Sequence, residues 1–437
     1  MGLTTPESVG KLQRALHAKA KESPEMRFYS LYDKIYRRDI LWFAYRIQRK
    51  NNGGPGADGV SFEQIQEYGV GEWLGELAEE LRNKRYGPSP VKRQWIEKSS
   101  GGKRPLGIPT IRDRVVQTAA VLVLQPIFEA DFHPQQHGYR PAHSAEDAVK
   151  EVHRLLTEGY TEVVDADLSG YFDSIPHEEL MKSVARRVSD GSVLELIKMW
   201  LEMPVEETDE DGNTHRSTRA RDERRGTPQG ASISPLLANI YMRRFMVAWE
   251  VLGVADALKA HIVNYADDFV ICCRDAAEEA MEAMRTLMQR LGLTVNERKT
   301  CLCSVPEESV RFLGYRIGEC YSPKTGRRYI GTEPRKKRVK GLFRDISEQT
   351  SAKHTTMERA EIVKKLNAKL RGWANYFSLG PVYKAYRKID AHVRKRLRQW
   401  LWRKHKQHGW APCRWTDDML YGTMGLIRLT DIRRNFS

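Results

Sequence analysis

The sequence is poor in cysteine and has no long apolar run. Its 437 residues include 6 cysteines, and none of them forms a CxxC pair, so neither a zinc module nor a disulfide framework is expected. No stretch of about 18 apolar residues occurs, and residues 1–6 lack the profile of a signal peptide. We therefore expect a cytoplasmic protein with reduced thiols and no membrane partner.

Positive charge is in excess, but only in one part of the chain. The net charge is +15, and 41% hydrophobic residues allow sizeable cores in about three domains. Residues 331–410 contain 22 Lys and Arg against 6 Asp and Glu, whereas the rest of the chain contains 50 against 51. A segment with so local an excess of cations predicts a polyanionic partner.

The basic segment also contains many aromatic residues, which favours RNA over a membrane surface as its partner. Cations neutralise phosphates, and aromatic faces stack unpaired bases. Residues 392–404 have helical periodicity, with an apolar stripe at Val393, Leu397 and Leu401. A solvated charged face is the alternative for this helix. Its candidate RNA-binding residues are Arg394, Lys395, Arg396 and Arg398.

The most informative motif is a pair of adjacent acids inside an apolar stretch. Asp267 and Asp268 end the tetrapeptide Tyr-Ala-Asp-Asp at 265–268, between the segments 261–264 and 269–272. This pattern predicts two short β-strands with the acids at the turn. Charges beside so much apolar surface favour a divalent cation held by oxygen ligands. A surface hairpin that uses Asp for its turn is the alternative, and the tetrapeptide alone does not decide between them.

A second acidic strand favours the metal site. Residues 162–168 have a strand pattern, and its period of two places Asp165 and Asp167 on one face. If this strand lies beside the hairpin, one of its acids joins Asp267 and Asp268 in a cluster. Closely packed carboxylates repel one another, so the cluster predicts bound Mg²⁺. The arrangement suits two-metal phosphoryl transfer, with a hydroxyl as the attacking group and pyrophosphate as the departing group.

In these motifs the sequence resembles the reverse transcriptases, and within them the proteins encoded by group II introns. The family has one catalytic Asp followed five residues later by an aromatic residue. This spacing selects Asp167 with Phe172 and leaves Asp165 as a polar neighbour. The resemblance implies that Phe172 closes the space that a ribose 2′-hydroxyl needs, although an ordinary core aromatic is the alternative. The implied metal ligands are Asp167, Asp267, Asp268 and the backbone carbonyl of Leu168.

Another block resembles the part of the family that positions the template and the nucleotide. It comprises Arg-Gly-Thr-Pro-Gln-Gly at 225–230 and the segment 234–241. Gly226 and Gly230 permit close backbone approach, and Gln229 offers an amide to a base or sugar edge. A Gly-Pro loop that caps a helix is the alternative, but it does not account for the whole string.

Three cations receive roles from the same resemblance. Residues 95–109 predict a strand, a Gly-rich turn and a strand, which resembles the fingers hairpin of the family. Lys98 and Arg104 are implied there as contacts to the nucleotide triphosphate. A solvated basic hairpin is the alternative. Lys299 is implied as a general acid toward pyrophosphate, with an ordinary exposed loop lysine as its alternative.

The resemblance extends over nearly the whole chain. Residues 366–377 look like the maturase domain, domain X, and imply RNA contacts by Arg371 and Trp373, while residues 312–315 resemble the primer grip. We predict an α+β right-hand polymerase with fingers, a palm with an antiparallel sheet and a helical thumb, plus a helical maturase domain. The expected domains are an N-terminal extension and fingers (1–150), a palm (151–318), a basic thumb and maturase domain (319–410), and a short tail (411–437) without the endonuclease domain of some relatives.

The implied reaction is RNA-templated addition of deoxynucleotides to the 3′ end of a DNA or RNA primer. It uses two Mg²⁺ ions, with Mn²⁺ as a substitute. The implied partners are group II intron RNA, an RNA template with its primer, dNTPs and target DNA, and a prokaryotic protein of this kind would associate with the nucleoid. The implied second role is that of a maturase, which stabilises the intron RNA and promotes splicing and mobility. Two alternatives remain open: an RNA-binding maturase with a degenerate polymerase, and a domesticated relative that acts in DNA repair or defence without an intron.

Overall fold

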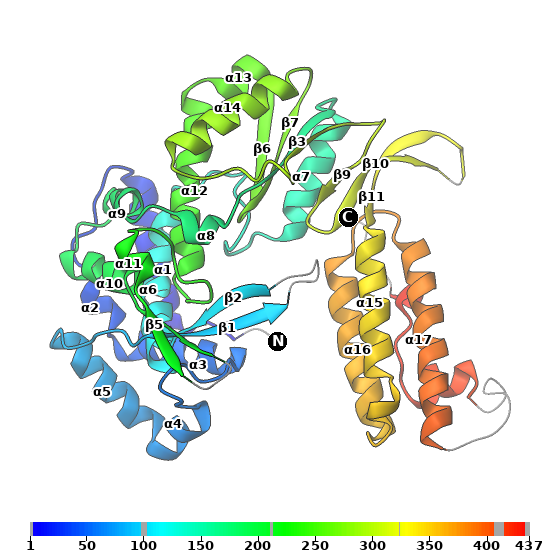
Figure 1. The fold of residues 1–437 in the computed structure, drawn as a ribbon, viewed down its shortest axis with the longest axis horizontal. Helices are drawn as coiled ribbons and strands as arrows, with labels where there is room; N and C mark the ends of the chain where they lie inside the picture. Colours follow the sequence, from blue (N-terminus) through cyan, green and yellow to red (C-terminus); the bar gives the residue numbers. More distant parts are fainter. Residues whose placement is uncertain (1–2, 98–102, 210–212, 323, 406–414, 433–437) are drawn as a thin grey trace. The chain divides into compact units, whose positions relative to one another are not determined.

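The computed structural model describes residues 3–97, 103–209, 213–322, 324–405 and 415–432 (Figure 1). The chain divides into two compact units. Unit 1 comprises Met1–Ser144, Ala166–Phe269 and Glu278–Cys301, and unit 2 comprises Ala145–Asp165, Val270–Ala277 and Leu302–Ser437. Both units contain helices and strands, so the mixed α and β class expected from the sequence is confirmed.

A buried helix organises the N-terminal part of unit 1. Helix α6 (Ile111–Glu129) has buried residues on all its faces, as expected for a helix that other elements surround. Helices α1 (Glu7–Glu22) and α3 (Arg38–Asn51) pack against it. The other helices before the first strand are α2 (Tyr32–Ile35), α4 (Phe62–Tyr68) and α5 (Val70–Arg82).

A four-stranded sheet in unit 1 contains the predicted basic hairpin. Its order is β2-β1-β4-β5. Strands β1 and β2 pair antiparallel, and β4 pairs in parallel with β1 and antiparallel with β5. The prediction of two strands in 95–109 is therefore confirmed, and the turn at 98–102 lies outside the described residues. The bounds are β1 (Val91–Glu97), β2 (Lys103–Ile108), β4 (Val205–Thr208) and β5 (Thr214–Ser217).

The two acidic motifs lie on neighbouring strands of a second sheet, whose order is β6-β7-β3-β8. Its strands are β3 (Glu162–Asp167), β6 (Ala260–Tyr265), β7 (Asp268–Cys273) and β8 (Cys301–Ser304). Both acidic strand predictions are thus confirmed, with Ala266 and Asp267 as the turn between β6 and β7. The helices nearby in sequence are α8 (Tyr171–Ser174), α9 (His177–Ala185), α10 (Gly191–Leu201), α11 (Arg219–Asp222), α12 (Ser234–Val251), α13 (Val254–Leu258) and α14 (Ala277–Arg290).

Unit 2 combines helix α7 (Ala145–Thr157), a three-stranded sheet and three long helices. The sheet has the order β11-β10-β9, with β9 (Val310–Phe312), β10 (Tyr315–Tyr321) and β11 (Arg328–Pro334). Leu313 and Gly314 join β9 to β10 with φ of 47° and 85°, which is the left-handed backbone of a tight two-residue hairpin. The long helices α15 (Lys336–Gln349), α16 (Arg359–Tyr376) and α17 (Tyr383–Lys404) lie side by side (Figure 1).

The segment 415–432 completes the core of the three long helices. Its buried side chains Trp415, Leu420, Leu426 and Leu429 belong to the same apolar cluster as the helix residues. The Asp390 carboxylate on α17 accepts hydrogen bonds from the backbone N–H groups of Leu429 and Thr430 at 2.9 and 3.1 Å. The limits at 150, 318 and 410 stay predictions about polymerase subdomains.

Within the described residues, no helix combines the length and the apolar character that crossing a membrane requires.

Candidate active site

The turn between β6 and β7 presents the adjacent acids toward solvent. Asn264, Ala266 and Phe269 are buried, whereas Asp267 is half-buried and Asp268 is exposed. Ala266 adopts a left-handed conformation with φ of 60°. This conformation is rare for a residue with a Cβ atom and has an intrinsic cost of about 1–2 kcal/mol, so the surrounding structure has to hold it.

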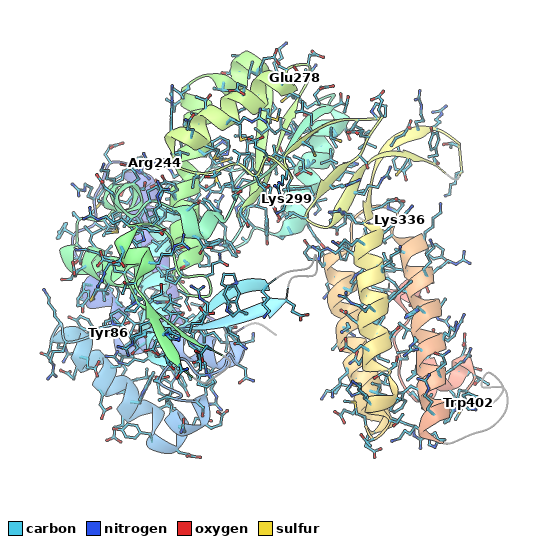
Figure 2. All side chains as sticks on the ribbon, in the orientation of Figure 1. Tyr86, Arg244, Glu278, Lys299, Lys336 and Trp402 are labelled. Atoms are coloured by element: carbon cyan, nitrogen blue, oxygen red, sulfur yellow. The ribbon has the colours of Figure 1, made fainter. Side chains whose placement is uncertain are left out.

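The carboxylate of Asp167, at the end of β3, is held by the segment that follows α14. The ammonium of Lys299, which is labelled in Figure 2, lies 3.1 and 2.9 Å from its Oδ1 and Oδ2 atoms. Asn296 Nδ2 donates to Oδ2 at 3.0 Å. The backbone N–H of Asn296 also donates to the Asp167 carbonyl at 2.8 Å. The Lys299 side chain is 65% exposed, so the ion pair itself adds little stability. The Lys299 ammonium is therefore the cation that neutralises the Asp167 carboxylate in this structure.

The two acidic motifs lie near each other within unit 1. Tyr171, four residues after Asp167, is fully buried and donates to the Ala238 carbonyl at 2.7 Å. Burial raises the pKa of the Tyr171 hydroxyl well above its usual value, and the negative charge of Asp267 adds to the rise. Across the described residues, however, no three His, Cys, Asp or Glu side chains form a ready-made metal cluster.

Phe172 lies on the one-turn helix α8 and is 7% exposed. Gly170 begins this helix in the left-handed conformation. The Phe172 ring meets the rings of Tyr171 and Tyr139 edge-on at 5.8 and 6.3 Å between centroids. Tyr139 is itself 49% exposed, so Phe172 lies just beneath the surface.

The loop at 225–230 is fixed between the segment of Phe172 and strand β2. The Thr227 N–H donates to the Phe172 carbonyl at 2.7 Å, and the Gly107 N–H donates to the Gln229 carbonyl at 2.6 Å. A Cβ atom on Gly230 would lie 2.3 Å from the Gly107 carbonyl oxygen. The close backbone approach predicted for this glycine is therefore confirmed.

Gln229 has an unexpected partner. Its Nε2 donates to Oδ2 of Asp173, the residue after Phe172, at 2.8 Å. Both side chains line a cavity of about 300 Å³ together with Arg93, Trp95 and Arg225. Gln229 is thus bonded to the residue that follows Phe172 in the chain. Lys98 lies outside the described residues, and so does the side chain of Arg104, whose backbone pairs with Ile96.

The four candidate cations of α17 do not share one role in the structure. Arg394 and Arg398 both bind the Asp417 carboxylate, at 3.0 and 2.7 Å. Arg396 donates to the Ser347 carbonyl at 2.7 Å and to Thr350 Oγ1 at 3.1 Å. The sequence could not separate these arginines from Lys395, which is exposed.

The two candidates on α16 also differ. Arg371 is exposed. Trp373 is half-buried, and its ring packs on Phe377 with a centroid distance of 4.6 Å. Arg371 and Lys395 are therefore better placed for a partner than Trp373.

Sequence reasoning missed several polar residues of this region. The strand pattern includes Asn264 only as part of an apolar segment. The sequence motifs give no role to four other residues: Gln136, Asn239, Asp173 and Asn296. Gln136, Asn239 and Asn264 are at most 2% exposed. An amide inside an apolar strand has to be hydrogen-bonded when it is buried, so the Asn before Tyr265 was a signal that the sequence did offer.

Comparison with known proteins assigns the chain to a family. Residues 96–317 match the family model described as reverse transcriptase (RNA-dependent DNA polymerase), and this match contains all three acids. Residues 339–416 match a second model, the group II intron maturase-specific domain. The chain belongs to the family of group II intron reverse transcriptases and maturases. It accordingly carries an RNA-directed DNA polymerase domain that belongs to a class using divalent metal ions, and a maturase domain that binds group II intron RNA.

Individual relatives agree with this assignment. Protein YkfC of Escherichia coli (strain K12) is 33% identical over 367 residues, which cover 75% of this chain and 93% of YkfC. The group II intron-encoded protein LtrA of Lactococcus lactis subsp. cremoris is 33% identical over 367 residues, covering 68% of this chain and 58% of LtrA. An uncharacterized 91 kDa protein in the cob intron of Schizosaccharomyces pombe is 23% identical over 416 residues, and the chain spans 50% of its length.

Proposed function

We propose that this chain synthesises DNA on an RNA template at Asp167, Asp267 and Asp268. The observation that carries the proposal is the strand order of the second sheet, in which β7, beginning at Asp268, is the neighbour of β3, ending at Asp167. Both motifs lie in the part of the chain that matches the reverse transcriptase model. Oxygen donors of this kind suit Mg²⁺, with Mn²⁺ as a substitute.

The three carboxylates, with the Leu168 carbonyl, would hold two divalent ions. When bound, the ions would activate the primer 3′-hydroxyl and neutralise the departing pyrophosphate. The Asn296 amide, which donates to Asp167 Oδ2 at 3.0 Å, would keep that carboxylate oriented. This role follows the rule that hydrogen bonds to ligating carboxylates fix their direction.

Lys299 would change partners during the reaction. Its ammonium now lies 2.9 Å from Asp167 Oδ2, and its side chain is largely exposed. Metal ions at Asp167 would repel the ammonium, and a flexible lysine side chain can then turn toward other anions. The pyrophosphate leaving group is such an anion, so Lys299 would serve as the proton donor toward it.

Phe172, Gln229, Lys98 and Arg104 would bind the incoming dNTP. Phe172 would close the space beside the sugar, and the amide of Gln229, oriented by its bond to Asp173, would contact the nucleotide. Lys98 and Arg104 on the β1–β2 hairpin would neutralise the triphosphate. In this proposal residues 1–150 form the extension and fingers, 151–318 the palm, and 319–410 the thumb and domain X of a right-hand polymerase.

The basic segment, residues 331–410, would bind group II intron RNA and promote splicing and mobility. Target DNA and the primed template would be further nucleic acid partners. The arginines and lysines of this segment are of two kinds, those that are exposed and those that already bind other groups of the protein. Exposed ones such as Arg371 and Lys395 are available for phosphates, whereas Arg396 is occupied by Ser347 and Thr350. The RNA-binding role is therefore proposed for the exposed cations first.

Replacing Arg371 and Lys395 together by Ala is expected to weaken binding of structured intron RNA and to reduce its salt dependence. Each phosphate contact that is lost lowers the slope of log K against log salt by about 0.7 to 0.9. The measurement is RNA binding over a salt series. Arg396→Ala is the control, because it should lower thermal stability and leave the slope unchanged. If the double variant keeps both the affinity and the slope of the wild type, these cations form a solvated face.

Primer extension tests the proposed polymerase. The purified chain should extend a DNA primer on an RNA template with dNTPs and Mg²⁺, and removal of the metal with EDTA should abolish extension. Added Mn²⁺ should restore it. A wild-type chain that binds intron RNA but extends no primer under any of these conditions would instead be an RNA-binding maturase.

A further inference from the structure

Three buried amides surround the turn that carries Asp267 and Asp268. Gln136, Asn239 and Asn264 are 0%, 2% and 1% exposed. Asn264 Nδ2 donates to the carbonyl of Ala266 at 2.8 Å. Ala266 is the residue with the unfavourable left-handed backbone, so this hydrogen bond reaches the strained point of the turn directly.

The other two amides join a neighbouring loop to helix α12. Gln136 Nε2 donates to the Asn239 carbonyl at 2.8 Å, and Asn239 Nδ2 donates to the Gly138 carbonyl at 2.6 Å. The backbone of Asn264 completes the connection, because its carbonyl accepts from the His137 N–H at 2.8 Å and its N–H donates to the Gln135 carbonyl at 2.9 Å. The loop at 135–138 therefore pairs with the end of β6 through a single parallel β-bridge between Gln136 and Asn264.

Gly138 brings this loop into direct contact with the turn. A Cβ atom at Gly138 would lie 2.3 Å from the backbone nitrogen of Ala266, so only glycine permits the approach. The next residue, Tyr139, meets the Phe172 ring. Arg140 supports the loop in turn, since it donates to the Gln136 carbonyl at 2.6 Å and pairs with Glu129 at 2.6 Å.

We propose that Asn264, with Gln136 and Asn239, positions Asp267 and Asp268 for divalent metal ions by holding Ala266 in its left-handed conformation. These three amides are positioning residues, because Asn264 binds the backbone of the turn, and Gln136 and Asn239 bind backbone carbonyls of α12 and of the adjoining loop. The inference rests on the proposed function in one respect, since it assumes that the two acids are metal ligands. Residues that orient ligands typically change metal affinity or activity by about 10- to 100-fold when they are removed.

Asn264→Ala is expected to weaken Mn²⁺ binding at the acids by about 10-fold or more. Binding is measured without nucleic acid, by titrating the full chain with Mn²⁺ and following the free ion by electron paramagnetic resonance. In primer extension the same variant should need more Mg²⁺ for half-maximal rate and should lower kcat, while KM for dNTP stays close to the wild-type value. These readouts separate positioning from a general loss of folded protein.

Two further variants make the test sharp. Asp190→Ala is the matched control, because Asp190 is also buried and accepts four backbone hydrogen bonds in unit 1, from Leu31, Tyr32, Ser192 and Val193. It should lower thermal stability and leave Mn²⁺ binding unchanged. If Asn264→Ala does not fold, Gln136→Met provides the same test with a smaller effect. Among the described residues Gln136 Oε1 has no hydrogen-bond partner, so this change removes one hydrogen bond and little else.

The outcome distinguishes this inference from the proposed function. Asp267→Asn is titrated in parallel and should lose the Mn²⁺ site. If Asp267→Asn binds Mn²⁺ like the wild type, the metal site itself is elsewhere and both proposals fail. If Asp267→Asn loses the site while Asn264→Ala and Gln136→Met bind Mn²⁺ and use Mg²⁺ like the wild type, the positioning role alone is overturned.

Discussion

Asp267→Asn is expected to reduce primer extension on an RNA template by on the order of 10³-fold or more. A catalytic metal contributes several kcal/mol of transition-state stabilisation, and each 1.4 kcal/mol is worth about tenfold in rate. An amide keeps the shape of the carboxylate but lacks the charge that two adjacent ions require. Because Asp267 is half-buried at a turn, the change should leave folding largely intact. The measurement is the single-turnover rate at saturating dNTP.

Asp165→Asn is the matched control for this prediction. Asp165 lies on β3 two residues before Asp167, and it is the acid that the sequence spacing leaves out of the site. Its variant should keep the wild-type rate within a few-fold, and Asp167→Asn should behave like Asp267→Asn. Equal rates for the wild type and Asp267→Asn would remove the polymerase assignment from these acids. A large loss in Asp165→Asn alone would move the catalytic role to the other acid of the strand.

Much of this site could be predicted because its signals are local. The strands around Asp267 and Asp268 follow from an apolar run with one polar break, and Gly230 follows from a loop that has to approach another backbone. The pairing of β3 with β7 is a long-range event, and the sequence offered it only as the condition under which the acids would form one cluster. The structure confirms these elements.

What could not be predicted depends on contacts between distant segments. A helical stripe shows that Val393 and Leu397 face a core, but it cannot show that Asp417 lies beside Arg394 and Arg398. In the same way an Asn inside an apolar strand indicates that Asn264 is hydrogen-bonded, but it cannot show that the backbone partners of Asn264 are Gln135 and His137, far away in the chain. Charge composition therefore pointed to the segment 331–410, which overlaps the match to the maturase-specific domain at 339–416. The contacts of its individual arginines could be seen only in the folded structure.

Phe172→Ala is expected to raise the use of ribonucleotides relative to deoxynucleotides by on the order of 10- to 200-fold. Steric selection by a pocket is worth about 1–3 kcal/mol per methylene-sized group, and the aromatic ring fills the volume that a 2′-hydroxyl needs. The effect should appear mainly as a higher kcat/KM for rNTPs, because the ring acts by clash and not by binding. The measurement is the ratio of kcat/KM for matched rNTP and dNTP on one template.

The alternative for Phe172 is an ordinary core aromatic. The control has to separate this structural role from a role in excluding the ribose 2′-hydroxyl. Phe128→Ala removes a ring that is 1% exposed on α6, and truncating a buried Phe typically lowers the free energy of unfolding by about 3–5 kcal/mol. It should cost stability without changing nucleotide selection. Phe172→Val serves as a milder test where the Ala variant is too unstable for kinetics. A ratio that stays at the wild-type value in both Phe172 variants, with only stability reduced, assigns the ring to the core. Discrimination against ribonucleotides would then have to come from the loop at 225–230, which donates to the Phe172 carbonyl through Thr227.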